Sequence, residues 1–195
     1  MKALKVILIT VMAAGISVGT ALLGQRLIGE RPQTQEIAID LDKDQIETLP
    51  DLRLKDLEGR EVPSNAWAGK VLILNFWATW CPPCLEEIPR FVAAQERLRP
   101  LGIQFVGIAV DQPEEVRALL ATQPINYPVL LATPEALNTA VQLGNWLEVL
   151  PFTAIFDRQG RRIHSQIGPL SDAELDRWLA PFLGSASQQK RTRAP

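Results

Sequence analysis

The chain has 195 residues, of which 47% are hydrophobic and 22% are charged, and its formal net charge is -2. This composition is typical of one folded domain with short appendages, and it excludes a disordered chain, a collagen and a disulfide-rich mini-protein. Because the 22 acidic residues outnumber the 20 basic ones, the chain also lacks the basic excess of a nucleic-acid-binding protein.

Residues 1–29 are predicted to form a membrane anchor or an export signal. The run from Val6 to Gln25 is uncharged, and as a helix it is long enough to cross the roughly 30 Å hydrocarbon core of a bilayer. Lys2 and Lys5 make a short basic start, which favours an N-terminus inside and a domain outside. Residues 19–21, Gly-Thr-Ala, imitate a cleavage site only poorly, so we favour an uncleaved anchor over a cleaved signal.

The chain after this segment divides by composition. Residues 30–48 are acidic with few large apolar residues, which predicts a solvated linker. Residues 49–184 have the patterns of a folded domain. Residues 185–195 are basic and polar, and we predict a flexible tail.

Predicted strands and helices alternate along the domain. The strands are expected at residues 52–57, 60–62, 71–76, 103–110, 127–131, 152–157 and 161–167. The helices are expected at residues 85–98, 113–122, 134–143 and 171–183. Pro89 should kink the first helix, because proline removes a helix hydrogen bond. The last helix has a capping-box pair, Ser171 and Glu174. Alternating strands and helices, closed by a hairpin and a helix, predict an α/β sandwich.

The two cysteines, Cys81 and Cys84, are separated only by Pro82 and Pro83. So short a loop would constrain the unfolded chain little, and the pair is therefore interpreted as a chemical site. Cys81 lies where a buried strand passes into a helix, whose unpaired N–H groups and dipole should favour its thiolate. Cys84 follows on the same side of the helix and can displace a partner bound to Cys81. We therefore predict that Cys81 is the nucleophile and Cys84 the resolving thiol.

Residues 76–84, Phe-Trp-Ala-Thr-Trp-Cys-Pro-Pro-Cys, resemble the active-site segment of the thioredoxin superfamily, and most of all its membrane-anchored TlpA/ResA/CcmG branch. The resemblance continues with Glu87 and Pro89, with residues 149–160 and with Gly168, and it covers residues 49–183. It implies a thioredoxin-like three-layer sandwich with a central mixed β-sheet. It also implies a thiol–disulfide oxidoreductase that uses no cofactor and no metal.

The resemblance also assigns roles to single residues. Pro151 would be a cis-proline lying against the cysteine pair, and the backbone of Leu150 would pair with the substrate chain. Asn75 stands where cytosolic thioredoxins have a buried aspartate that assists proton transfer, so a proton acceptor is needed elsewhere. Glu86 and Glu87 are the nearest acids in the sequence. The resemblance favours Glu87 as a base, whereas the simpler interpretation makes both of them solvated residues of the first helical turn.

Several further residues border the pair in the sequence. Trp80, Pro82, Pro83 and Leu150 are predicted to contact the substrate, although Trp80 could equally shield the core. His164 is given no role, because a lone histidine in a strand of the closing hairpin is usually a packing or surface residue. The tryptophans Trp67, Trp146 and Trp178 are assigned to the core or its rim.

The resemblance predicts a protein of the bacterial inner membrane whose domain faces the periplasm. It would take electrons from a membrane donor of the thiol–disulfide type and reduce disulfides in exported proteins, apocytochrome c among them. An oxidant that introduces disulfides would use the same site and stays an alternative.

Two other functions have less support. A thiolate site for a soft ion such as Cu(I) lacks a nearby third ligand, since Met1 and Met12 lie in the N-terminal segment. A peroxidase would need threonine three positions before Cys81, where the chain has Ala78.

Overall fold

The computed structural model describes residues 46–191, with side chains described as far as Leu183. Seven strands form one mixed sheet in the order β2-β1-β5-β4-β3-β6-β7. The strands are β1 (Arg53–Asp56), β2 (Glu61–Pro63), β3 (Val71–Trp77), β4 (Ile103–Ala109), β5 (Val129–Leu131), β6 (Phe152–Phe156) and β7 (Arg162–Ile167). The helices are α2 (Pro82–Leu98), α3 (Pro113–Thr122), α4 (Pro134–Gln142) and α5 (Asp172–Arg191), with short 3-10 turns η1 (Ser64–Trp67) and η2 (Arg99–Leu101).

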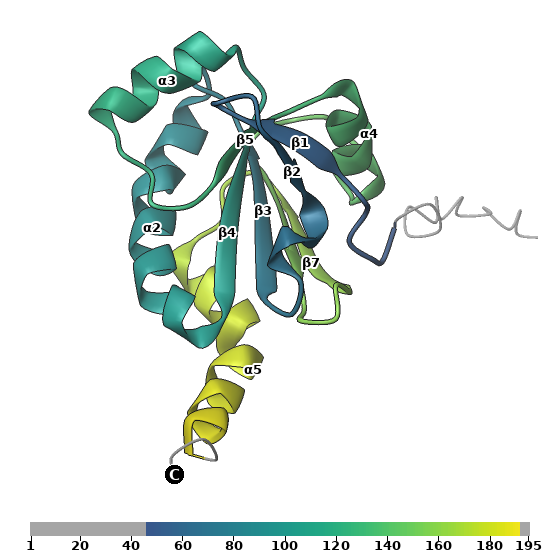
Figure 1. Cartoon of the computed structure of the whole chain (residues 1–195), viewed down its shortest axis with the longest axis vertical. Coiled ribbons are helices and arrows are strands. Elements are labelled where there is room, and N and C mark those ends of the chain that lie inside the picture. Colours follow the sequence, from purple (N-terminus) through teal and green to yellow (C-terminus); the bar gives the residue numbers. More distant parts are fainter. Residues whose placement is uncertain (1–45, 192–195) are drawn as a thin grey trace, which may run out of the picture. The chain divides into compact units, whose positions relative to one another are not determined.

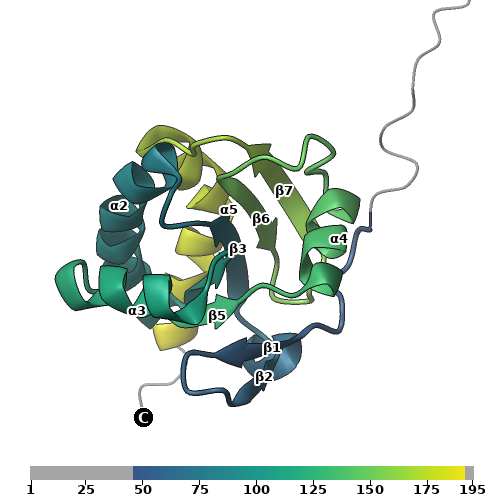
Figure 2. The same cartoon turned by 90° about the horizontal axis from the view of Figure 1, so that it is seen from above.

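Helices cover both faces of the sheet, which gives the predicted three layers (Figures 1 and 2). Apolar residues of α2 and α5 pack in one cluster on one face, and α2 and α3 share a second cluster there. The apolar side of α4 packs on the opposite face. The central strands β3 and β4 are parallel and buried at every position, as their largely apolar sequences predict.

Two predicted boundaries of the domain differ from the structure. Ile46, Glu47 and Thr48 were assigned to the linker, yet they join the domain by backbone hydrogen bonds or bridge pairing with Gln142, Arg162 and Arg161 respectively. The other difference is at the C-terminus, where α5 passes through Pro181 and continues to Arg191, into the predicted tail. The predicted anchor and the linker up to residue 45 lie outside the described residues. Within residues 46–191, no helix is long and apolar enough to span a bilayer.

The proline within α2 removes a hydrogen bond from the helix without ending it. Pro89 has no N–H to donate to the carbonyl of Leu85 one turn earlier. That carbonyl instead accepts a long hydrogen bond of 3.5 Å from the side chain of Gln123, which follows α3. A side chain from a neighbouring segment therefore takes the place of the missing helix donor.

Gly107 on β4 gives room to the buried indole of Trp77. A Cβ atom at this position would lie 2.8 Å from Trp77 Nε1 and 3.4 Å from Tyr127 Cε2, and the rigid, fully buried indole would have to shift. Gly107→Ala should therefore lower the free energy of unfolding by about 1–3 kcal/mol in urea denaturation. In a Trp77→Phe background the same change should be nearly neutral. An equal loss in both backgrounds would contradict this packing argument.

Candidate active site

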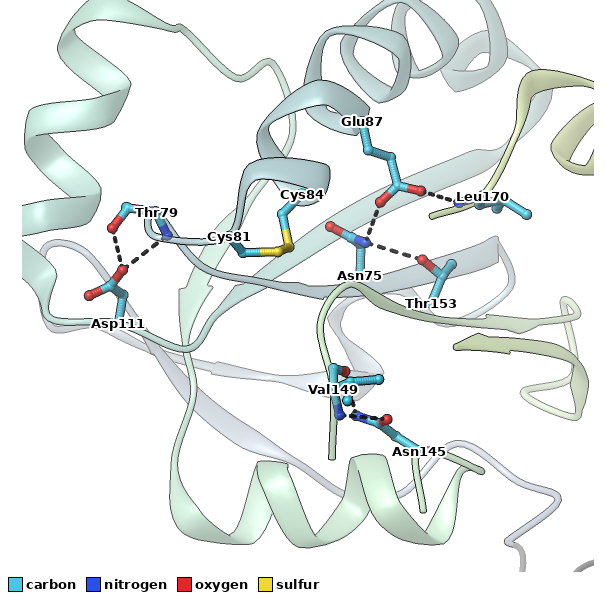
Figure 3. The surroundings of a disulfide bond; sticks show 10 residues. All are labelled: Asn75, Thr79, Cys81, Cys84, Glu87, Asp111, Asn145, Val149, Thr153 and Leu170. Carbon is cyan, nitrogen blue, oxygen red and sulfur yellow. Dashed lines mark hydrogen bonds between the residues drawn. A yellow bond between two sulfur atoms is a disulfide. The ribbon is translucent and has the colours of Figure 1, made fainter. Parts of the chain in front are cut away.

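The two cysteines form a disulfide at the start of α2 (Figure 3). Cys81 is the N-cap residue of the helix and Cys84 lies in its first turn, with 5.3 Å between their Cα atoms. Both are buried, since 4% of Cys81 and 1% of Cys84 are exposed. A strand that ends directly before a helix thus brings the pair to one end of the sheet.

The helix start differs from the expectation in its hydrogen bonds. Pro82 and Pro83 occupy the first two helical positions, which favours the helix start but leaves both without an N–H group. The next two N–H groups, of Cys84 and Leu85, donate to the carbonyl of Cys81 at 3.0 and 3.2 Å. The prediction of unpaired N–H groups near the sulfur is therefore wrong, whereas the helix dipole still favours a Cys81 thiolate.

Asp111 holds the turn that leads into the pair. One of its carboxylate oxygens accepts hydrogen bonds from both the backbone N–H (3.0 Å) and the hydroxyl of Thr79 (Figure 3). Burial raises the pKa of this carboxyl, but the hydrogen bonds from Thr79 and Gln112 outweigh it and hold the pKa below its ordinary value. Because β3 and β4 are parallel neighbours, the segments that follow them meet at one edge, which explains a contact that the sequence analysis missed.

Glu87 is buried behind the disulfide, with 1% of its surface exposed. Its carboxylate accepts hydrogen bonds from the backbone N–H of Leu170 (2.6 Å) and from the Asn75 side chain (3.2 Å). The interpretation of Glu87 as a solvated residue is therefore wrong, whereas Glu86 is exposed. Burial raises the pKa of Glu87 from 4.5 to about 7 despite these hydrogen bonds and the nearby Arg90.

Asn75 connects three elements behind the cysteines. Its side-chain nitrogen donates both to Glu87 and to the hydroxyl of Thr153 (3.1 Å), and Asn75 and Thr153 lie opposite each other in the β3–β6 register. Figure 3 shows Asn75 between Glu87 and Thr153, on the side of Cys84 away from Cys81. Asn75 thus orients a carboxylate that comes from α2. Sequence reasoning did not find Thr153 or Leu170, which only tertiary pairing brings to the site.

The segment before β6 completes the site. The peptide bond between Leu150 and Pro151 is cis, as the resemblance implied. β6 pairs with β3 from Phe152 opposite Phe76, so Pro151 lies level with the end of β3, where the chain turns toward Cys81. Leu150 packs against the apolar cluster that contains both cysteines.

A groove of about 440 Å³ runs beside this segment, and it brings together Trp80 and Leu150 but not Pro82 or Pro83. Trp80 is 66% exposed, so it is a surface residue and does not shield the core. Of the other aromatic residues, Trp146 is 55% exposed, Trp67 is half-buried, and Trp178 is half-buried and stacks on His164 with ring centroids 4.6 Å apart.

Comparison with known proteins supports the chemistry of this site. A profile of the AhpC/TSA family matches residues 46–163. The thiol–disulfide oxidoreductase ResA of Geobacillus thermodenitrificans is 30% identical over 58% of this chain and 64% of its own length, which is less than two thirds of that relative. ResA of Bacillus cereus is 26% identical over 72% of this chain and 80% of its own.

A solved structure of similar sequence is also a thiol–disulfide protein. The crystal structure of a thiol:disulfide interchange protein of the thioredoxin family from Chlorobium tepidum is 35% identical, with a TM-score of 0.64 over 70% of this chain and 96% of its own. With the profile match over more than half of the chain and the disulfide at the start of α2, the chain belongs to the AhpC/TSA family, as a thioredoxin-like thiol–disulfide oxidoreductase.

Proposed function

We propose that the protein reduces disulfide bonds in exported proteins. The observation that carries this direction is the lack of free N–H donors at the start of α2, where Pro82 and Pro83 have none and the next two donate to Cys81 itself. A strong disulfide oxidant owes its potential to a stabilised reduced form. A Cys81 thiolate that receives no N–H from the first turn of α2 is stabilised less, which favours the reducing direction.

The exchange proceeds in two steps in this proposal. The Cys81 thiolate attacks one sulfur of the substrate disulfide, so that a mixed disulfide forms and the other substrate sulfur leaves as a thiolate. Cys84 then gives its proton, through a water, to Glu87 and attacks Cys81. The second substrate sulfur leaves as a thiolate, both substrate thiolates take up protons from the solvent, and the enzyme is left as the disulfide. A carboxylate with a pKa of about 7 accepts a thiol proton more readily than an ordinary glutamate does.

The proposed substrate surface lies beside the pair. Trp80 and Leu150 line the groove, and we assign the backbone of Leu150 to pairing with an extended substrate chain next to Pro151. Pro82 is exposed and Pro83 is half-buried, which places them on the outer side of the disulfide, where a substrate sulfur would approach.

The proposed setting is the periplasmic side of a bacterial inner membrane. Residues 1–29 would anchor the chain, residues beyond them would form the linker, and a membrane thiol–disulfide donor would return the pair to the dithiol. Disulfides of apocytochrome c are one substrate class that fits this setting. The alternative that uses the same site is an oxidant that introduces disulfides.

The reduction potential of the pair decides between these directions. The full chain in mild detergent is equilibrated with glutathione or dithiothreitol redox buffers, and thiol alkylation gives the fraction reduced. We expect a value near or below about -220 mV, in the range of thioredoxin and glutaredoxins. A value near about -120 mV would instead make the protein an oxidant.

A further inference from the structure

One buried side chain holds the loop that precedes Leu150. Asn145 is 4% exposed. Its amide nitrogen donates to the carbonyl of Val149 at 3.0 Å, and its amide oxygen accepts from the N–H of Val149 at 3.2 Å (Figure 3). We call these two hydrogen bonds the Asn145 clamp. The backbone N–H of Asn145 donates to the carbonyl of Ala140 at 2.9 Å, which fixes the clamp to the end of α4. A single amide thus satisfies both backbone groups of Val149.

The clamped loop has a conformation that an unrestrained chain would seldom adopt. Glu148 lies at a φ of 52°, a left-handed conformation that is uncommon for residues other than glycine. Its N–H donates to the carbonyl of Asn145 at 2.9 Å. Asn145 therefore bonds the loop through its backbone carbonyl, to Glu148, and through its side chain, to Val149, and these bonds hold Glu148 in its left-handed conformation.

The loop presents the surface on which a polypeptide would lie. Trp146, Leu147 and Val149 are 55%, 50% and 40% exposed, and Val149 lines the groove together with Trp80 and Leu150. Exposed apolar residues gathered beside a reactive centre are typical of a binding surface. The clamp occupies the backbone groups of Val149. The backbone groups of Leu150, between Val149 and Pro151, have no partner in residues 46–191.

We propose that Asn145 is a positioning residue for polypeptide substrates. It does not touch the sulfur atoms; it fixes the loop so that the backbone of Leu150 and the apolar groove face an extended chain in one register. The inference rests on the proposed reduction of protein disulfides. Small disulfides, which need neither the groove nor backbone pairing, should react independently of Asn145.

The test compares two substrates with the full-length protein. Asn145→Ala should lower kcat/KM for insulin reduction about tenfold, mainly by raising KM, because two hydrogen bonds that order the loop are lost. The rate with the small disulfide DTNB and the equilibrium constant of the Cys81–Cys84 pair with glutathione should each change less than twofold. The matched control is Asn126→Ala, which removes an exposed amide that donates to Val92 (2.9 Å) away from this loop; both of its rates should stay unchanged.

A second variant separates positioning from general damage to the fold. In Asn145→Asp, a protonated carboxyl can donate to one backbone group of Val149 and accept from the other, whereas a carboxylate can only accept. Its insulin rate relative to its DTNB rate should therefore recover as the pH is lowered through the pKa of the new carboxyl. Asn145→Ala should show no such recovery.

Two outcomes would overturn the inference: equal losses with insulin and DTNB, or unchanged insulin kinetics in Asn145→Ala. If the wild-type protein proves to be an oxidant, the proposed direction fails on its own. The same variants are then tested for oxidation of a reduced polypeptide against a small dithiol, where a selective loss with the polypeptide still supports the clamp.

Discussion

Cys84→Ser should turn the protein from a catalyst into a trap for its substrates. The Cys81 thiolate of this variant can still attack a disulfide, but no second thiol is present to displace the bound partner. Multiple turnover should fall to the uncatalysed background, and mixed disulfides through Cys81 should accumulate. Non-reducing electrophoresis of a periplasmic extract, followed by mass spectrometry, measures them.

The matched variant is Cys81→Ser, which leaves only the more deeply buried cysteine. It should capture nothing, because only 1% of Cys84 is exposed, so an incoming disulfide has little access to its sulfur. Equal capture by both variants would show that either thiol can act as the nucleophile. Capture by neither would count against the exchange mechanism.

Glu87→Gln should remove a large part of the pH dependence of stability. The pKa of Glu87 is raised from 4.5 to about 7 in the folded protein. Between these pH values the folded state keeps a proton that the unfolded state has released, so the free energy of unfolding falls as the pH rises. The contribution is fully present below pH 4.5 and is lost above pH 7, a change of about 3 kcal/mol in all.

The variant isolates this change, because glutamine has nearly the same shape and does not titrate. If the Asn75 amide turns over, its oxygen can accept from both the new amide and the Thr153 hydroxyl, so the site stays bonded. In urea denaturation between pH 4 and 8, the free energy of unfolding of the variant should rise by about 3 kcal/mol relative to that of the wild type as the pH rises. Glu86→Gln, at the exposed neighbour, should follow the wild type. Parallel curves for Glu87→Gln and the wild type would refute the raised pKa.

The sequence predicts this fold well, because its signals are local. Largely apolar runs mark β3 and β4, which are buried at every position, and prolines mark the first turns of α3 and α4. The spacing of Cys81 and Cys84 likewise contains the chemistry of the site in four consecutive residues.

The surroundings of the pair were harder to predict, because they depend on contacts between distant segments. The carboxylate of Glu87 meets the N–H of Leu170, 83 positions away in the chain, and no local pattern signals that a glutamate one turn beyond Cys84 is buried. Asn145 is a polar residue among exposed apolar ones. Its role depends on the path of a loop that periodicity does not describe.

Pro89 and Gln123 show how two distant positions come to depend on each other. With any other residue at position 89, the Leu85 carbonyl would regain its helix N–H and would no longer depend on the Gln123 amide. With proline in place, loss of the Gln123 side chain would leave the Leu85 carbonyl without a hydrogen-bond donor from the protein. The order in which substitutions at these two sites are tolerated is therefore constrained, and a change at one should be accepted more readily once the other has changed.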